Sequence, residues 1–204
     1  IDDKPVIMIY SMNDLIGGLG GLKQTKDALD WFRKEVKKAG FEGLELQYSL
    51  RLDGRRDIIV DGDTVGEEKQ LVEQLGFNSL NHYVYAHMTG IDRDYKEVLK
   101  DAERIWNWVS DNYEAKYYPQ VSVGWDASPR AHKFIGGIIR NSNPENFEIA
   151  LRKAKDFVDK HPDQAPLITV NSWNEWTETS YLMPCTMHGK GYLEALKRVF
   201  VDDK

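Results

Sequence analysis

The sequence predicts an α/β fold of the (β/α)8 TIM-type barrel class, with the 204 residues forming the C-terminal five strand–helix units. Short apolar, β-branched runs alternate five times with segments that repeat apolar residues at helical spacing. This alternation is typical of parallel sheets with right-handed crossovers. The long polar and aromatic loops also follow strands, as they do at the carboxyl-end face of a barrel.

An open doubly wound sheet is the alternative architecture, but it gathers functional loops only near one switch point. Five units cannot close a barrel, so we expect the first three units to be absent from this chain or supplied elsewhere. Residues 1–204 are expected to form a single catalytic barrel domain, the C-terminal portion of a longer barrel, because nothing in them looks like a linker.

Five strands are expected, at residues 6–10, 43–48, 77–83, 119–125 and 167–172. The first is a continuous apolar run, the pattern of a strand buried on both faces, and the last begins with apolar and β-branched residues. The third is polar at its C-terminal end. Between them, residues 11–22 are rich in glycine but match no phosphate-binding frame, so a flexible loop is expected. Residues 51–63 are expected to be a charged loop.

The helices are predicted from their caps and apolar spacing. Thr25 is expected to cap the first, which stops at Gly40. Thr64 and Glu67 suggest a capping box for the second. The others are expected over residues 94–112, from Asn143 with Pro144 at the first helical position, and over residues 192–200.

Composition narrows the class of partner. The net charge of −6 and pI of about 5.4 argue against nucleic acid or anionic membrane as the main partner. Six Trp and ten Tyr suit carbohydrate binding, because an indole face can stack on a pyranose, although core packing is the alternative. No apolar run approaches the roughly 18 residues of a transmembrane helix, so none is expected.

The first residue is Ile1, not Met, so this is expected to be a processed chain or a fragment. The sequence leaves its localisation and oligomeric state open, and a hydrolase would favour a periplasmic, cell-surface or secreted location. Cys185 is the single cysteine, which excludes an intrachain disulfide, and it has no obvious base beside it.

Polar and aromatic side chains at the ends of all five predicted strands are expected to converge on one carbohydrate-binding cleft. The expected substrate-binding residues are Tyr10, Tyr48, His82, Tyr83, Trp125, Asp126, Arg130, Trp173, Asn174 and Trp176.

Glu175 and Glu178 follow the last predicted strand and are the candidate catalytic residues. In one helical turn, residues three apart share a face at about 5–6 Å, a separation that suits retaining glycoside hydrolysis. Repulsion and partial burial would raise the pKa of one carboxyl group and keep it protonated as the acid. The alternative is a pair of solvated carboxylates at a helix start.

Asp126 and Arg130 lie in the segment GWDASPR, directly after the fourth predicted strand. Asp126 could bind a sugar hydroxyl and Arg130 could orient a carboxylate, or the two could form a loop salt bridge. His82 could bind a hydroxyl or be a satisfied histidine at a strand end.

No metal and no cofactor are expected. His132, His161 and His188 lack metal-ligand spacing. The two Asp-x-Asp patterns, residues 61–63 and 92–94, read more readily as a turn and a helix start.

The runs VNSWNEWTETSYLMP and HGKGYLEAL resemble the C-terminal signature of glycoside hydrolase family 99 and its WbsX-like relatives, and GWDASPR resembles a WbsX-like segment. The resemblance implies a (β/α)8 barrel that acts with retention on α-mannosidic linkages without a metal. It implies that Glu175 deprotonates the sugar 2-hydroxyl, giving an anhydro sugar, and that Glu178 is the general acid/base.

The chain departs from the family pattern at Thr179, Met183 and residues 127–128, which leaves the carboxylate pair intact and the sugar specificity open. The expected function is therefore a retaining glycoside hydrolase acting on a polysaccharide or glycan, with an α-mannosidic linkage as the candidate that the resemblance implies. The alternatives are a WbsX-like polysaccharide-biosynthesis glycosyltransferase and a non-catalytic glycan-binding protein.

Overall fold

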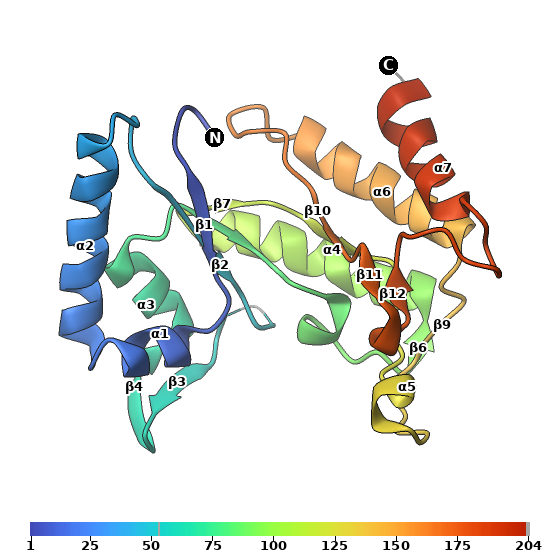
Figure 1. Cartoon of the computed structure of the whole chain (residues 1–204), viewed down its shortest axis with the longest axis horizontal. Helices are drawn as coiled ribbons and strands as arrows, with labels where there is room; N and C mark the ends of the chain where they lie inside the picture. The colour runs from blue at the N-terminus through green and yellow to red at the C-terminus, as the bar shows by residue number, and fades with distance from the viewer. Residues whose placement is uncertain (53, 203–204) are drawn as a thin grey trace. The chain divides into compact units, whose positions relative to one another are not determined.

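The computed structural model describes residues 1–52 and 54–202 and forms two compact units. The first unit contains Ile1–Asn81 and Trp108–Tyr117, and the second contains His82–Asn107 and Tyr118–Lys204. Figure 1 colours the chain from its N-terminus to its C-terminus. The candidate carboxylates belong to the second unit.

The first unit is built on a four-stranded parallel sheet, in the order β1-β2-β5-β7. The strands are β1 (Val6–Ile9), β2 (Glu45–Ser49), β5 (Ser79–Asn81) and β7 (Lys116–Tyr117). Every residue of β2 and β5 is buried, as expected for interior parallel strands covered on both faces.

Three helices and a hairpin complete the first unit. They are α1 (Met12–Gly18), α2 (Leu22–Lys38), α3 (Glu68–Leu75) and the antiparallel pair β3 (Asp57–Val60) and β4 (Asp63–Glu67). The helix α2 contacts both α1 and α3, while α1 and α3 contact the hairpin strands. Gly76 ends α3 in the left-handed conformation, which glycine adopts without a steric cost.

Four local predictions in the first unit are wrong. Residues 51–63, expected to be a loop, contain β3 and the start of β4. The glycine-rich loop contains α1, where the Ser11 side chain accepts a hydrogen bond from the Asp14 amide and caps the helix. Thr25 lies inside α2 and its hydroxyl donates to the Gly21 carbonyl, so it is not a cap. Thr64 and Glu67 lie in β4, where strand pairing uses the backbone groups that a capping box would need.

The second unit contains short parallel strand pairs and a hairpin. They are β8 (Gln120–Ser122) with β10 (Thr169–Asn171), β6 (Arg93–Asp94) with β9 (Ile139–Arg140), and the antiparallel β11 (Asn174–Glu175) with β12 (Ser180–Tyr181). The segment that follows the fourth predicted strand contains the short helix α5 (Ser128–Ala131) and then β9.

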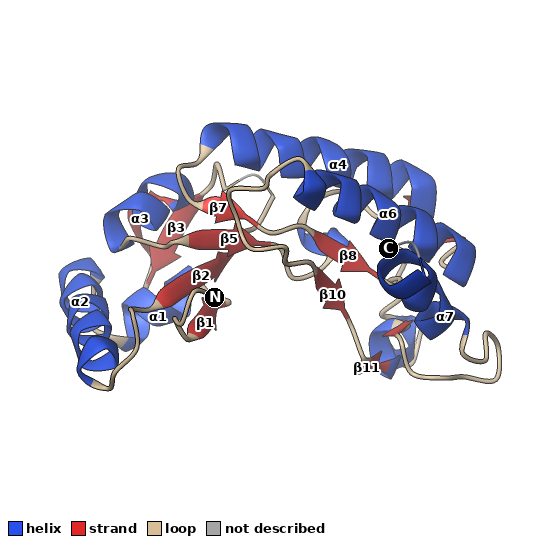
Figure 2. Ribbon diagram, turned by 90° about the horizontal axis from the view of Figure 1, so that it is seen from above, coloured by secondary structure: helices blue, strands red, loops and turns tan. Residues whose placement is uncertain are grey.

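Helices pack around these strands. They are the 3₁₀ turn η1 (Tyr85–His87), α4 (Tyr95–Asn112, in the second unit up to Asn107), α6 (Pro144–Asp159) and α7 (Gly191–Lys197), which continues into a π-helical turn (Arg198–Asp202). Figure 2 shows α6 beside β8 and α7, which it contacts. The predicted Asn143 cap is confirmed, since its side chain accepts a hydrogen bond from the Asn146 amide at 2.9 Å.

Aromatic side chains fill the core of the second unit. The Tyr95 hydroxyl donates to the Ser122 carbonyl at 2.6 Å, which ties α4 to the end of β8. The Trp106 and Phe157 rings meet edge to face between α4 and α6, with their centroids 6.2 Å apart. These contacts hold β8 and its following loop in a fixed position.

The α/β class is confirmed, because each of the five predicted strand segments contains a strand and all five strands pair in parallel. In the described residues the strands form separate ladders and no closed ring. The complete barrel therefore stays a prediction. No helix of the described part of the chain combines the length and apolar character needed to span a bilayer.

Candidate active site

The candidate site forms where the chain leaves β10. After Asn171 the chain enters the β11–β12 hairpin, and the 3₁₀ turn η2 (Trp176–Glu178) connects its two strands. Thr179 closes this turn in the left-handed conformation, with φ of 55°. Glu175 thus ends one strand of the hairpin and Glu178 ends its turn, in place of the α-helical turn that their spacing predicted.

Four contacts made by two serine hydroxyls hold the hairpin at the end of β10. The buried Ser180 hydroxyl lies 2.9 Å from both the backbone carbonyl and Oδ1 of Asn171. The Ser172 hydroxyl donates to the Ser180 carbonyl at 2.7 Å and accepts from the Glu175 amide at 3.2 Å. The backbone that carries both glutamates is therefore held by buried polar contacts.

One guanidinium bridges the two carboxylates. Nη2 of Arg130 lies 2.9 Å from Oε1 of Glu175, and Nη1 lies 2.8 Å from Oε1 of Glu178. The Thr177 hydroxyl also donates to Oε1 of Glu175, at 3.1 Å. The two carboxylates therefore lie within the reach of a single side chain and form a pair.

The environments of the two carboxyl groups differ. The side chain of Glu178 is 9% exposed, whereas that of Glu175 is 36% exposed. Burial raises the pKa of Glu178; Arg130 acts against this effect and the neighbouring charge of Glu175 adds to it. Glu178 is thus the member of the pair that is better suited to hold a proton.

Backbone contacts join the loop after β8 to the glutamate hairpin. The Asp126 amide donates to the Glu178 carbonyl at 2.9 Å, and the Thr179 hydroxyl donates to the Asp126 carbonyl at 3.2 Å. The Asp126 carboxylate accepts from the Ser128 amide at 2.8 Å, at the start of α5. This arrangement sets α5, and with it Arg130, against the two glutamates.

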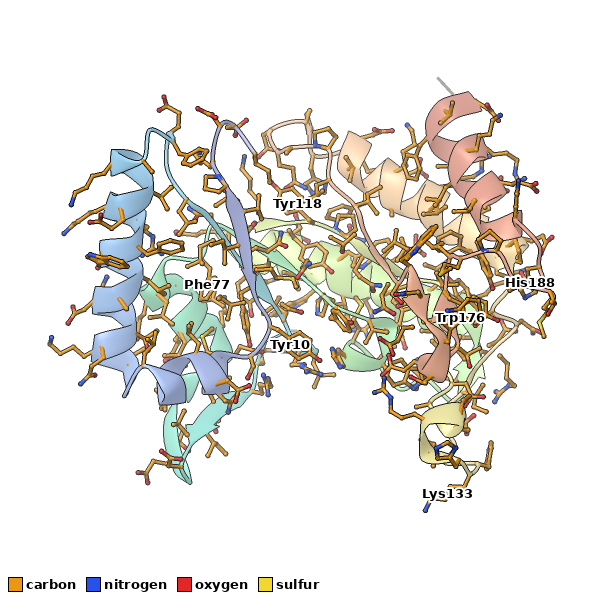
Figure 3. The ribbon with its side chains drawn as sticks, in the orientation of Figure 1. Tyr10, Phe77, Tyr118, Lys133, Trp176 and His188 are labelled. Atoms are coloured by element: carbon orange, nitrogen blue, oxygen red, sulfur yellow. The ribbon has the colours of Figure 1, made fainter. Side chains whose placement is uncertain are left out.

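The indoles of the hairpin are solvent-accessible. Trp173 is 53% exposed and Trp176 is 44% exposed. Trp176 stacks on Tyr181 with ring centroids 4.0 Å apart and an interplanar angle of 25°. Asn174 is exposed beside them and Trp125 is half-buried. Figure 3 labels Trp176 on this hairpin. Two indoles and an amide side chain are therefore accessible on the hairpin that carries the carboxylate pair.

The remaining predicted site residues have different surroundings. In the second unit, His82 is fully buried, and the Tyr83 ring stacks on the His87 ring with centroids 6.0 Å apart. In the first unit, Tyr10, which Figure 3 labels, is exposed. Its hydroxyl accepts a hydrogen bond from Arg51 at 2.9 Å. The convergence of all the predicted residues on one cleft stays a prediction.

Tyr48, also in the first unit, is fully buried, and its hydroxyl donates to the Glu68 carboxylate. This contact places Tyr48 in the core of that unit.

The sequence reasoning did not single out Ser172, Thr177 and Ser180, whose hydroxyls hold the glutamates and the hairpin. Their only signal is that small hydroxyl residues alternate with the acidic and indole side chains in NSWNEWTETS. Within the described residues, no group of three or more His, Cys, Asp or Glu side chains is arranged to hold a metal ion.

Solved structures identify the fold class. Two structures of the GH99 endo-alpha-mannosidase from Bacteroides thetaiotaomicron, one in complex with bis-tris-propane, match 98% of this chain. Their TM-scores are 0.56 and 0.54, with 15% and 16% sequence identity, and the match covers 54% and 57% of the solved chains. At this identity, the likeness shows a shared fold.

The family follows from the sequence match. Residues 1–196 match the family described as Glycosyltransferase WbsX, and the chain belongs to this family. It is 27% identical over 201 residues to an uncharacterized protein WxcX of Xanthomonas campestris pv. campestris, with 97% of this chain and 27% of the relative covered. The chain thus spans about a quarter of that relative. The resemblance to the family 99 and WbsX-like group is confirmed.

Proposed function

We propose that this chain carries the catalytic carboxylate pair of a retaining glycoside hydrolase acting on a polysaccharide or glycan. The observation that carries the proposal is the bridging of Glu175 and Glu178 by the single guanidinium of Arg130. Retaining enzymes need two carboxyl groups close together, with one protonated and one ionised. The shared arginine supports the short separation, and the difference in burial supports the division of roles.

Glu178 is proposed as the general acid. Its burial favours the protonated form, as the raised pKa indicates, so it can give its proton to the glycosidic oxygen as the bond to the anomeric carbon breaks. Once the leaving sugar departs, Glu178 is a carboxylate and can take a proton from water. One buried carboxyl group thus serves both half-reactions.

Glu175 is proposed as the base that takes the proton from the sugar 2-hydroxyl. The freed oxygen attacks the anomeric carbon as the leaving group departs, giving an anhydro sugar. Water then opens this ring at the anomeric carbon and Glu175 returns the proton, so two inversions give net retention. Direct attack by the Glu175 carboxylate is the other retaining route, and mass spectrometry would detect its covalent glycosyl-enzyme.

Arg130 is proposed to hold the pair in register. Its two nitrogens bind one oxygen of each glutamate, and an arginine fork restrains orientation better than a single charge does. The guanidinium also opposes the effect of burial on Glu178. Arg130 therefore sets both the geometry of the pair and the pH at which the acid loses its proton.

A glycosyltransferase is the second candidate, favoured by the description of the family to which the chain belongs. The same carboxylate pair could serve transfer, because the two reactions differ in whether water or a sugar hydroxyl receives the glycosyl group. The test compares the full-length protein with manno-oligosaccharides and with nucleoside diphosphate sugars.

Hydrolysis of an oligosaccharide without an added donor supports the hydrolase. Turnover that occurs only with a sugar nucleotide, together with thermal stabilisation by nucleoside diphosphates, contradicts it. The single barrel domain over residues 1–204 also remains a proposal, supported by the parallel strand pairs and by the fold shared with GH99.

A further inference from the structure

A pocket of about 550 Å³ lies on the segment that follows Glu175 and is lined by Trp176, Pro184, Cys185 and Thr186. Its volume is in the range of small-molecule sites, about 300–1,000 Å³. All four lining residues fall within eleven residues of one another in the second unit. The proposed catalytic roles of the site make no use of this pocket.

The aromatic wall of the pocket is held in place. Trp176 stacks on Tyr181, which lies in β12. Burial raises the pKa of the Tyr181 hydroxyl, and its contact with Cys185 adds to this effect. Tyr181 therefore contacts both Trp176 and Cys185, two of the four residues that line the pocket.

The other wall is fixed by the backbone. Leu182 and Met183 donate their amides to the Trp173 carbonyl, each at 3.1 Å. Cys185 and Gly189 form a bridge with two backbone hydrogen bonds, and the His188 amide lies 3.2 Å from Sγ of Cys185. Backbone hydrogen bonds therefore hold the segment from Leu182 to Gly189 at both of its ends.

The chemistry of the lining selects a class of ligand. Trp176 and Pro184 offer flat apolar surface, Thr186 offers a hydroxyl, and none of the four lining side chains carries a formal charge. A pyranose has one C–H face for an indole and hydroxyl groups at its edge for a polar partner. An anionic phosphate or uronate would find no cation among the lining residues.

We propose that this pocket is a subsite for a neutral pyranose, adjacent to the sugar that reacts at the carboxylate pair. The proposal rests on the proposed function and deepens it, because Trp176 follows Glu175 directly and shares the turn η2 with Glu178. A glycan bound across the site would place its reacting linkage at the glutamates and a neighbouring sugar on Trp176. The substrate is thus a glycan with a neutral hexose beside the cleaved bond.

Alkylation of Cys185 can measure the occupancy of the pocket, because this half-buried residue lines the pocket and is the single cysteine of this chain. The experiment uses the full-length protein with Glu178→Gln, so that the glycan persists, and short α-linked manno-oligosaccharides as the probe. Alkylation of Cys185 by iodoacetamide is followed by peptide mass spectrometry. At ten times the Kd, mass action predicts alkylation about tenfold slower than without glycan.

Two variants in the same background remove the subsite in different ways. Trp176→Ala removes the platform and should weaken the Kd by about tenfold, which reduces the protection from about tenfold to about twofold at the same glycan concentration. Thr186→Trp fills the exposed side of the pocket while leaving the Trp176–Tyr181 stack in place. Trp31→Ala, which removes a 61% exposed indole on α2 of the first unit, is the matched control and should keep full protection.

The outcomes separate the subsite from the proposed function. If calorimetry shows that a manno-oligosaccharide binds while Cys185 is alkylated at an undiminished rate, the subsite is refuted and the hydrolase proposal stands. Full protection in both Trp176→Ala and Thr186→Trp also refutes the subsite. If no manno-oligosaccharide binds, the subsite is refuted for this class, and the wild-type cleavage assay decides the hydrolase proposal independently.

Discussion

Replacing Glu178 by Gln tests the division of roles between the two carboxyl groups. The substitution keeps the volume of the side chain and an oxygen that Arg130 can bind at its present 2.8 Å. It removes the dissociable proton that the proposed mechanism places on the leaving oxygen. The rest of the hairpin is held by Ser172 and Ser180, so its position should not change.

The expected loss follows from the size of general acid catalysis. A positioned acid contributes about 10²–10⁴-fold, and kcat/KM for a glycan with a sugar leaving group should fall by that factor. This fall corresponds to about 3–5 kcal/mol of transition-state stabilisation. A much smaller loss is expected with a 2,4-dinitrophenyl glycoside, because dinitrophenolate leaves without a proton.

The substitution that lowers activity should also make the protein more stable than wild type as the pH rises. Because burial raises the pKa of Glu178 in the folded state, the stability associated with its protonation is present below its ordinary pKa and is lost as pH rises through the raised pKa. The Gln variant has no such loss. Its Tm relative to wild type should therefore increase as the pH rises from 4 to 8.

The assay compares kcat/KM of the variant on both substrates, with Glu194→Gln as the control. Glu194 is an exposed glutamate on α7, and its replacement should leave both rates unchanged. Equal losses on the sugar and dinitrophenyl leaving groups, or wild-type turnover by Glu178→Gln, would refute the role of Glu178 as the acid.

Three further substitutions test the supports of the site. Arg130→Met removes the cation that opposes burial, so the pKa of Glu178 should rise further. The alkaline limb of the pH–rate profile should then move to higher pH, and an unchanged limb would count against the bridge. Ser180→Ala leaves two buried acceptor oxygens of Asn171 without this donor and should cost about 1–3 kcal/mol in urea unfolding. Asn143→Ala removes the cap of α6 and should cost about 1 kcal/mol by the same measurement, with kcat unchanged. A loss of activity without a loss of stability in this last variant would contradict its purely structural role.

The strands and long helices could be predicted because they depend on local pattern. Strand β1 (Val6–Ile9) lies within the continuous apolar run of residues 6–10 that predicted it. Asn143 and Pro144 start α6 because the amide side chain and the fixed φ of proline both act within one turn.

The errors came from residues whose role depends on distant partners. Thr64 and Glu67 have the spacing of a capping box, but pairing with β3 uses them in a strand. In the glycine-rich segment, the burial of Met12 and Ile16, four residues apart, reflects α1, and the glycines obscured that helical spacing. Strand pairing overrode the local preference of Thr64 and Glu67 for a helix start. The apolar spacing of Met12 and Ile16 was a genuine helical pattern that was overlooked.

The candidate catalytic residues could be predicted from the sequence, but the contacts between them could not. Two acidic residues among indoles after a strand indicated a pair, whereas Arg130, 45 residues before Glu175, could be matched to both carboxylates only in three dimensions. The difference in burial between Glu175 and Glu178 arises from the hairpin turn. No local pattern encodes that difference, although it decides which carboxyl group favours its proton.

The most direct test of the central claim, a carboxylate pair that cleaves a glycan with retention, is the anomeric form of the first product. The full-length protein is incubated with α-linked manno-oligosaccharides and the reaction is followed by proton NMR before mutarotation. The account predicts that the α-anomer appears first, and that Glu178→Gln does not form it. A first product of β-configuration, or no cleavage by the wild-type protein alongside turnover of a sugar nucleotide, would contradict it.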